Sequence, residues 1–154
     1  MSSKPRPPEA RSGVSRNQPA SNSFALKLDF TIPAQIAAIS PLVETIMTAV
    51  RQHAKSKELA IETALREALT NAVRHGCSCD PSKLVLCSMV FGNADVLIVV
   101  SDPGSGFNPE HIPDPTEGEN IFENHGRGIY LIHQLMDEVS FKRSGAEIHM
   151  RSRF

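Results

Sequence analysis

Residues 67–76 carry the polar side chains whose spacing is best suited to chemistry. Glu67, Asn71 and His75 follow one another at intervals of four residues. In an α-helix such residues lie one turn apart on the same face, with Cβ atoms about 5–6 Å apart. A carboxylate and an amide oxygen at that separation can share a small cargo, such as hydrated Mg2+ with its phosphates. The same spacing also fits the solvated face of an ordinary amphipathic helix.

A second candidate segment follows the apolar residues 95–101. Asp102 comes first, with Gly104 and Gly106 close behind it. A carboxylate can accept a hydrogen bond from the N6 amine of adenine, and glycines let the backbone approach a base and ribose closely. Asp, Pro and Gly are also favoured in ordinary turns. The segment therefore predicts either the base-reading part of a nucleotide site or a turn without a ligand.

A third candidate segment combines glycine with a cation where a helix is expected to begin. Gly126 and Gly128 flank Arg127, and Ile129 is the first buried residue of the apolar pattern that follows. A helix N-terminus offers unpaired backbone N–H groups and the positive end of the helix dipole, and both favour phosphate. Read alone, this segment can also be the end of a loop before a core helix.

Hydrophobic periodicity predicts the elements that must position these three segments. Helix-type spacing marks two consecutive helices before residue 77, and alternating or continuous apolar residues mark the strands. The expected order is a strand at 24–32, a helix from a Ser40-Pro41 cap to about 53, a helix at about 58–76 ended by Gly76, strands at 83–91 and 95–101, a polar lid at 107–125, a helix from 126, and a hairpin of strands at 138–143 and 147–153.

This order groups strands and helices instead of alternating them, and so predicts an α+β fold. We expect a two-layer α/β sandwich with a mixed, mostly antiparallel sheet and its helices on one face. Residues 1–23 are rich in Ser, Pro, Arg, Asn and Gln, which predicts a disordered N-terminal tail. The folded domain is expected to occupy residues 24–154.

Composition limits the classes of function. The chain is 40% hydrophobic and 21% charged, as in ordinary globular proteins, and its formal net charge of −1 argues against bulk binding to nucleic acid or an anionic membrane. There is no apolar run of transmembrane length and no apolar signal-peptide core, so we expect a cytoplasmic protein. The three cysteines, Cys77, Cys79 and Cys87, do not suggest a disulfide framework.

Taken together, the three segments resemble a known family. Residues 67–76, 102–106 and 126–128 are similar, in this order, to the N, G1 and G2 boxes of the GHKL (Bergerat-fold) ATPase superfamily. Within it, the chain most resembles the bacterial anti-sigma-factor serine/threonine kinases, whose signature runs like Glu-Ala-x-Thr-Asn-Ala-x-x-His-Gly. The resemblance covers about residues 24–154.

The resemblance implies a site for ATP and Mg2+ and gives roles to particular residues. It makes Glu67 the general base that acts on a serine or threonine hydroxyl, Asn71 the ligand of Mg2+, and Asp102 the reader of adenine. The remaining residues that it places around the nucleotide are Arg74, His75, Gly104, Gly106, Gly126, Arg127, Gly128 and Ile129. Arg74 and His75 can instead simply complement the dipole at the end of their helix.

The resemblance also implies partners: a sigma factor that is sequestered, a STAS-domain anti-anti-sigma protein that is phosphorylated, and a second copy in a homodimer. We expect no direct contact with nucleic acid or membrane. Two residues depart from the family pattern, since Asn124 stands where an arginine is common and Ala146 stands where a threonine hydroxyl serves the adenine pocket.

Three functional hypotheses follow from these features. The first is an anti-sigma factor serine/threonine kinase, which the presence of Glu67 favours because binding alone needs no base. The second is a regulatory binding module that holds ATP and has little or no kinase activity, which the two departures favour. The third is the detached catalytic half of a histidine kinase, against which the short lid counts, as does the lack of a dimerisation helix with a phosphoacceptor histidine.

Overall fold

The computed structural model describes residues 25–107 and 124–154, with side chains in the second range from residue 126 onward. The predicted tail at 1–23 and most of the predicted lid lie outside the described residues. Within the described ranges, each predicted helix and strand is present, and its bounds lie within two residues of the expected ones except at the end of the second helix.

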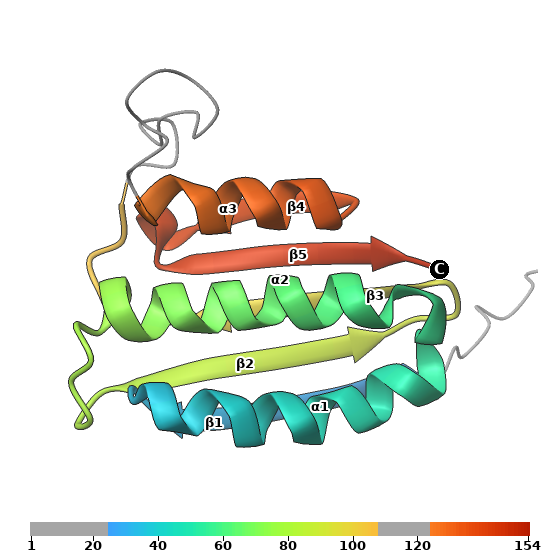
Figure 1. Ribbon diagram of the computed structural model, residues 1–154, viewed down its shortest axis with the longest axis horizontal. Helices are drawn as coiled ribbons and strands as arrows, with labels where there is room; N and C mark the ends of the chain where they lie inside the picture. Colours follow the sequence, from blue (N-terminus) through green and yellow to red (C-terminus); the bar gives the residue numbers. More distant parts are fainter. Residues whose placement is uncertain (1–24, 108–123) are drawn as a thin grey trace, which may run out of the picture.

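The described residues form five strands and three α-helices, joined by short helical turns (Figure 1). In chain order the strands and α-helices are β1 (Leu26–Pro33), α1 (Ile39–His53), α2 (Glu58–Asn71), β2 (Leu84–Phe91), β3 (Asp95–Ser101), α3 (Asn124–Leu135), β4 (Glu138–Lys142) and β5 (Glu147–Arg153). The shorter turns cover Ile36–Ala38, Lys55–Lys57, Ala72–Gly76 and Arg143–Gly145.

The five strands form one sheet in the order β1-β2-β3-β5-β4. All three α-helices cover the same face of this sheet (Figure 1), which confirms the predicted α+β sandwich. Every strand pairing among the described residues is antiparallel, so the sheet is antiparallel throughout and not mixed as predicted. The reason is that the chain enters at the edge strand β4 after α3, and the final hairpin then returns β5 against β3 in the antiparallel direction.

Alternation along the strands decides which side chains enter the core. In β2, Cys87 and Met89 face the helices and are buried, whereas Leu84 and Leu86 point to the uncovered face and are about half exposed. Ile98 of β3 lies opposite Met89 in the register and is also fully buried. The helices complete the core with aliphatic stripes at helical spacing. The largest of these helix side chains with no exposed surface are Val43, Ile46, Val50, Ile61, Leu65, Leu69 and Ile132.

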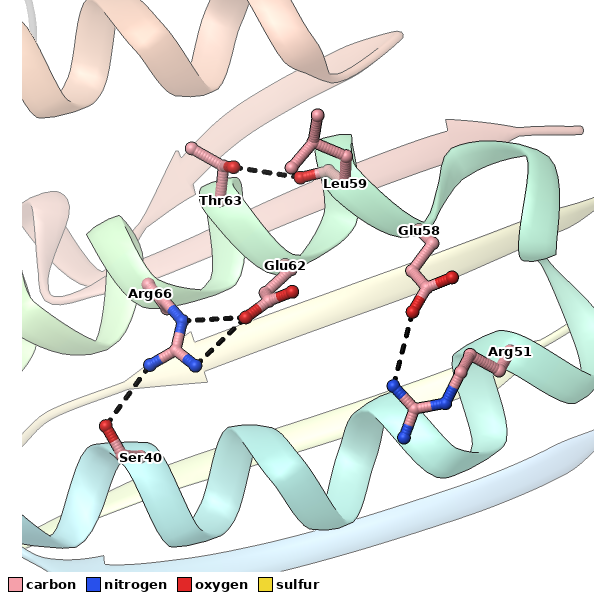
Figure 2. A network of polar contacts seen from close by, with 7 residues as sticks. All are labelled: Ser40, Arg51, Glu58, Leu59, Glu62, Thr63 and Arg66. Carbon is pink, nitrogen blue, oxygen red and sulfur yellow. Dashed lines mark hydrogen bonds and ion pairs between the residues drawn. The ribbon is translucent and has the colours of Figure 1, made fainter.

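The predicted cap at Ser40 is wrong. A 3-10 turn at Ile36–Ala38 leads directly into α1, so the helix begins at Ile39 and its cap position is Ala38, which makes no side-chain cap bond. Ser40 instead lies in the first turn, where its Oγ accepts a hydrogen bond from Arg66 Nη1 of α2 at 3.3 Å (Figure 2). Arg66 also pairs with Glu62 at 2.9 Å, so this network joins the two helices across their surface.

The second helix ends differently from the prediction. The α-helical part stops at Asn71, and residues Ala72–Gly76 continue as one π-helical turn. The N–H of Cys77 donates to the carbonyl of Ala72 at 2.9 Å, which is the five-residue step of a π turn. Such turns are rare and occur often at functional sites. In the described part of the chain, no helix is long and apolar enough to cross a bilayer.

Candidate functional site

Glu67 and Asn71, two of the predicted site residues, lie together on the partly exposed side of α2. Its core-facing residues, such as Leu65 and Leu69, are fully buried, which leaves Glu67 and Asn71 partly exposed one turn apart. Helix α3 packs beside α2 (Figure 1). Gly128 of α3 lies directly against this pair. A Cβ atom on Gly128 would lie 2.5 Å from Oε2 of Glu67 and 3.6 Å from Nδ2 of Asn71.

Asp102 stands at the end of β3, against the end of the π turn. Its N–H donates to the carbonyl of Ala146 at 3.0 Å, and its Oδ1 accepts from the N–H of Gly104 at 2.8 Å. A Cβ atom on Gly76 would overlap the Asp102 carboxyl group, and one on Gly104 would overlap the carbonyl oxygen of Gly76. The helix that carries Glu67 and the predicted adenine reader are therefore joined through two glycines without intervening side chains.

Burial and nearby positive groups shift the pKa of the Asp102 carboxyl in opposite directions. Burial raises the pKa of its carboxyl above the ordinary value of 3.8, while the N–H of Gly104 and the positive charges of Arg143 and Lys83 act to lower it. Arg143 is held in place by a hydrogen bond from Nη1 to Oγ of Ser101 at 2.7 Å. Asp102 is partly exposed, and two cations act on its carboxylate. Arg143 and Lys83 were not predicted as site residues, because both lie in turns whose side-chain directions only the fold determines.

The loop after Asp102 crosses the turn between β4 and β5. Gly106 has φ +78° and Gly145 has φ +91°, conformations that residues with a Cβ rarely adopt. A Cβ on Gly106 would overlap the carbonyl oxygen of Ser144, and one on Gly145 would lie 2.9 Å from the N of Phe107. The ring of Phe107 also packs edge-on against Phe141, with centroids 5.5 Å apart. Gly106 was among the predicted site residues, whereas Gly145 was not.

The third predicted segment lies inside α3 and not ahead of it. The helix begins at Asn124, two residues earlier than predicted, so Gly126 is among its first residues and Gly128 is its fifth. Arg127 is exposed, whereas Gly126, Gly128 and Ile129 are buried. The amides that a helix leaves without intrahelical partners are its first four. Gly126 is therefore suited to donate to a phosphate through its backbone.

Arg74 and His75 lie exposed in the π turn, at the end of the helix that carries Glu67. Their position complements the negative end of the helix dipole. It also places two basic residues close in sequence to Gly76, which contacts the Asp102 carboxyl. The geometry therefore keeps both interpretations of Arg74 and His75 open.

The residues present fit a magnesium ion held together with a nucleotide. Among the described residues no group of three or more His, Cys, Asp or Glu is arranged to hold a metal ion. Mg2+ usually keeps several waters and takes one or two protein ligands plus substrate phosphates. Asn71, partly exposed and close to the first turns of α3, is a suitable single protein ligand for an ion that arrives with phosphates.

Comparisons with known proteins find similar chains. Residues 32–152 match the model of the family described as the histidine kinase-like ATPase domain. The chain is 33% identical over 135 residues to the serine-protein kinase RsbW of Staphylococcus epidermidis, covering 80% of this chain and 84% of that protein. It is 30% identical over 128 residues to the anti-sigma F factor of Clostridium perfringens, covering 80% and 83% of the two chains. The anti-sigma F factor of Bacillus cytotoxicus is 31% identical over 127 residues, with 78% and 77% covered.

Proposed function

The chain belongs to the histidine kinase-like ATPase family, and we propose that it is an anti-sigma factor serine/threonine kinase that uses ATP to phosphorylate a STAS-domain partner. The observation that carries this proposal is the position of Glu67, one helical turn from Asn71 and directly against Gly128 of α3. A module that only binds a nucleotide has no need for a carboxylate there. Relatives named serine-protein kinase and anti-sigma F factor support the same proposal.

In this proposal Glu67 accepts the proton of a serine or threonine hydroxyl of the partner protein. The hydroxyl oxygen forms a bond to the γ-phosphorus of ATP, the bond from that phosphorus to the bridging oxygen breaks, and ADP leaves with the electron pair. Asp102 accepts a hydrogen bond from the adenine amine. The first amides of α3, Gly126 among them, donate to the phosphates beside Arg127.

Asn71 would hold Mg2+ together with the phosphates, and the ion would supply charge neutralisation for the transferred group. The side-chain amide oxygen of Asn71 matches the preference of Mg2+ for oxygen ligands. The chain itself thus contributes positioning of the nucleotide and of the proton acceptor, which is what phosphoryl transfer demands of a protein.

We further propose two binding partners besides the substrate, namely a sigma factor that the protein sequesters and a second copy in a homodimer. Phosphorylation of the STAS-domain protein would control whether it can compete for the kinase and release the sigma factor. The names of the anti-sigma F relatives support the sigma factor as a partner.

A second candidate function is a binding module that holds ATP and a regulatory partner with little transfer activity. Ala146 favours it, because this residue lies beside Asp102, whose N–H donates to the Ala146 carbonyl, and its methyl side chain offers no hydroxyl to a base. Under this alternative the nucleotide stabilises the partner-binding conformation and Glu67 has no chemical task.

The test is transfer of label from ATP–Mg2+ to STAS-domain proteins of the same organism, with Glu67→Gln measured beside the wild type. Glu62→Gln is the matched control, because Glu62 lies on the same helix but pairs with Arg66 away from Asn71. Loss of a general base typically lowers the rate by about 10²–10⁴-fold. We expect that loss for Glu67→Gln with ATP affinity retained, and wild-type rates for Glu62→Gln.

Label on a serine or threonine with the wild type alone supports the kinase. Nucleotide binding by calorimetry without transfer to any STAS-domain protein favours the binding module. Equal transfer by the wild type and Glu67→Gln would remove Glu67 from the role of base.

A further inference from the structure

The turn between β4 and β5 contacts the loop that follows β3 at four places. The contact pairs, from turn to loop, are Arg143 with Ser101, Ser144 with Gly106, Gly145 with Phe107, and Ala146 with Asp102. In the last three pairs the turn contributes backbone atoms, whereas Arg143 donates from its side chain, with Nη1 2.7 Å from Oγ of Ser101. A substitution at Arg143 can therefore remove one contact and leave the other three in place.

The backbone of this turn holds Arg143 in a conformation that residues with a Cβ rarely adopt. Arg143 has φ +49°, Ser144 has φ +54° and Gly145 has φ +91°. Left-handed backbone is unfavourable for L-residues other than glycine, and it persists where the surrounding structure holds it. The hydrogen bond to Ser101, which lies 42 residues away in the sequence, is one of the contacts that hold it.

Ser101 directs this contact to the side of the sheet that the helices leave uncovered. Side chains alternate along β3, and Val100 faces the helices with 2% of its surface exposed, so Ser101 points the opposite way. The Asp102 carboxyl lies on the helix side, against Gly76. Arg143 therefore approaches Asp102 from the uncovered side, where it acts on a bound base through the carboxylate and not by contact.

The charge of Asp102 decides which base suits it. An ionised carboxylate only accepts hydrogen bonds, whereas a protonated carboxyl also donates one. Adenine presents an amine donor at C6, and guanine presents a carbonyl acceptor there. Burial favours the protonated form of Asp102, and the positive charge of Arg143 favours the ionised form. An ionised Asp102 accepts from adenine and repels the guanine oxygen.

We propose that Arg143 is a positioning residue that sets the base specificity of the site. Held by its bond to Ser101, the guanidinium keeps the neighbouring Asp102 carboxyl an acceptor, which suits adenine and disfavours guanine. This inference rests on the proposed function in so far as Asp102 reads the base. The action of Arg143 on Asp102 can be measured without any nucleotide.

The other charged or titratable groups on the elements around Asp102 limit the size of the effect. They are Asp80 and Lys83 ahead of β2, Arg74, His75 and Cys77 at the π turn, and Glu147 and His149 of β5. Lys83 is a second cation that acts on Asp102. Cys77 is a neutral thiol because burial raises its pKa, and Glu147 is paired with His149 at 2.6 Å. Replacement of Arg143 should therefore weaken the preference for the ionised form and not abolish it.

The action on Asp102 is tested by NMR titration of its carboxyl in the full chain without nucleotide. Arg143→Gln is expected to raise the pKa of Asp102 above the wild-type value, because a nearby positive charge is lost. Ser101→Ala frees the guanidinium but keeps its charge, so it should raise this pKa by less. The matched control is Lys142→Gln, which removes the same charge from the exposed neighbouring residue and should leave the wild-type titration. Glutamine has a Cβ as arginine does, so the cost of the left-handed backbone is unchanged.

The consequence for specificity is tested by calorimetry with ATP and with GTP. We expect Arg143→Gln to raise the Kd for ATP by about two- to fivefold at pH 6, in line with the loss of one exposed charge interaction. The loss should shrink toward pH 8, where Asp102 is ionised in both proteins. The ratio of the Kd for GTP to the Kd for ATP should fall in the variant as pH is lowered. Arg143→Lys keeps the charge and should restore most of the wild-type behaviour.

The outcomes separate this inference from the proposed function. An Asp102 titration in Arg143→Gln that matches the wild type would overturn the inference, whether or not the protein is a kinase. A rise in Kd that is equal for ATP and GTP at every pH would make Arg143 a contact of the phosphates or a structural residue, and would overturn its role in specificity. If the wild type binds no nucleotide, the proposed function fails, while the titration still decides whether Arg143 acts on Asp102.

Discussion

The two ends of the sheet are held together in different ways. At the end of β3 that carries Asp102, elements meet through glycines: Gly76 lies against the Asp102 carboxyl, and Gly106 lies against the carbonyl oxygen of Ser144. At the other end, near the C-terminus (Figure 1), elements meet through ion pairs of Arg151 with Asp95 and of Arg151 and Arg153 with Glu138.

The difference shows how much each end tolerates change. Where backbone lies directly on a neighbouring group, any added atom must displace it, so substitution is costly. Exposed ion pairs are screened by water and salt and contribute little individually. The site end therefore has its geometry fixed by the absence of side chains, whereas the distal end is held by side chains that can be exchanged. Three substitutions test this difference in tolerance.

The largest effect is expected from Gly106→Ala at the site end. Alanine must adopt φ +78° there, and its methyl group would overlap the Ser144 carbonyl oxygen. The strain and the overlap together are expected to lower the free energy of unfolding by about 3 kcal/mol. Denaturant unfolding measures this, with the exposed neighbour in Ser105→Ala as control. A loss no greater than that of Ser105→Ala would show that the two loops can separate freely.

An intermediate effect is expected from Asp102→Asn, and it has opposite signs for binding and stability. A charged hydrogen bond is worth about 1.5–3 kcal/mol, so ATP affinity should fall by about tenfold or more. Burial raises the pKa of the Asp102 carboxyl, so the folded protein binds its proton more tightly than the unfolded chain does. The stability from this group is thus present below the unfolded pKa and lost as pH rises through the folded pKa.

Asparagine does not titrate, so the Asp102→Asn variant does not lose this stability as pH rises. The nucleotide-free variant should therefore have a higher unfolding midpoint than the wild type at pH 7, and the difference should vanish below pH values near the ordinary 3.8. Asp80→Asn is the control with the opposite sign, because hydrogen bonds from Ser82 lower the pKa of Asp80. Its stability is present above the unfolded pKa and lost as pH falls through the folded one. A midpoint for Asp102→Asn below that of the wild type at pH 7 would contradict the buried setting.

The smallest effect is expected from Glu138→Gln at the distal end. This carboxylate pairs with Arg151 at 3.4 Å and with Arg153, and its side chain is 54% exposed. Removing the charge should change the free energy of unfolding by no more than about 1 kcal/mol, and less in high salt. ATP affinity, measured by calorimetry on the same sample, should not change. A large loss of stability would mean that the distal end is as sensitive as the site end.

The helices and strands were predictable because hydrophobic periodicity depends only on residues near one another in the sequence. The aliphatic stripe of α2, the alternation in β1 and the apolar run of β3 are local patterns, and the structure confirms the elements they predict. The cap at Ser40 was not predictable in the same way. Whether Ser40 caps a helix or accepts a bond from Arg66 depends on a preceding 3-10 turn and on a residue of another helix.

The candidate site also combines features that belong to one element with features that depend on the whole fold. The spacing of Glu67 and Asn71 on one helical face, and Asp102 at the end of a strand, were available from the sequence, because each is a property of one element. The antiparallel course of the whole sheet was not available, since it depends on where the chain re-enters after α3. The electrostatic contribution of Lys83 and Arg143 to Asp102 was equally hidden, because both act across the fold.

The types of residue at the site, their order and the elements that carry them can be read from the amino-acid sequence. Which atoms each glycine contacts depends on the fold. Gly76 and Gly106 meet a carboxyl group and a carbonyl oxygen from other segments, and Gly128 meets the carboxylate of Glu67. A glycine looks the same in any sequence, and the atom that excludes its side chain belongs to a different part of the chain, which only folding brings within reach.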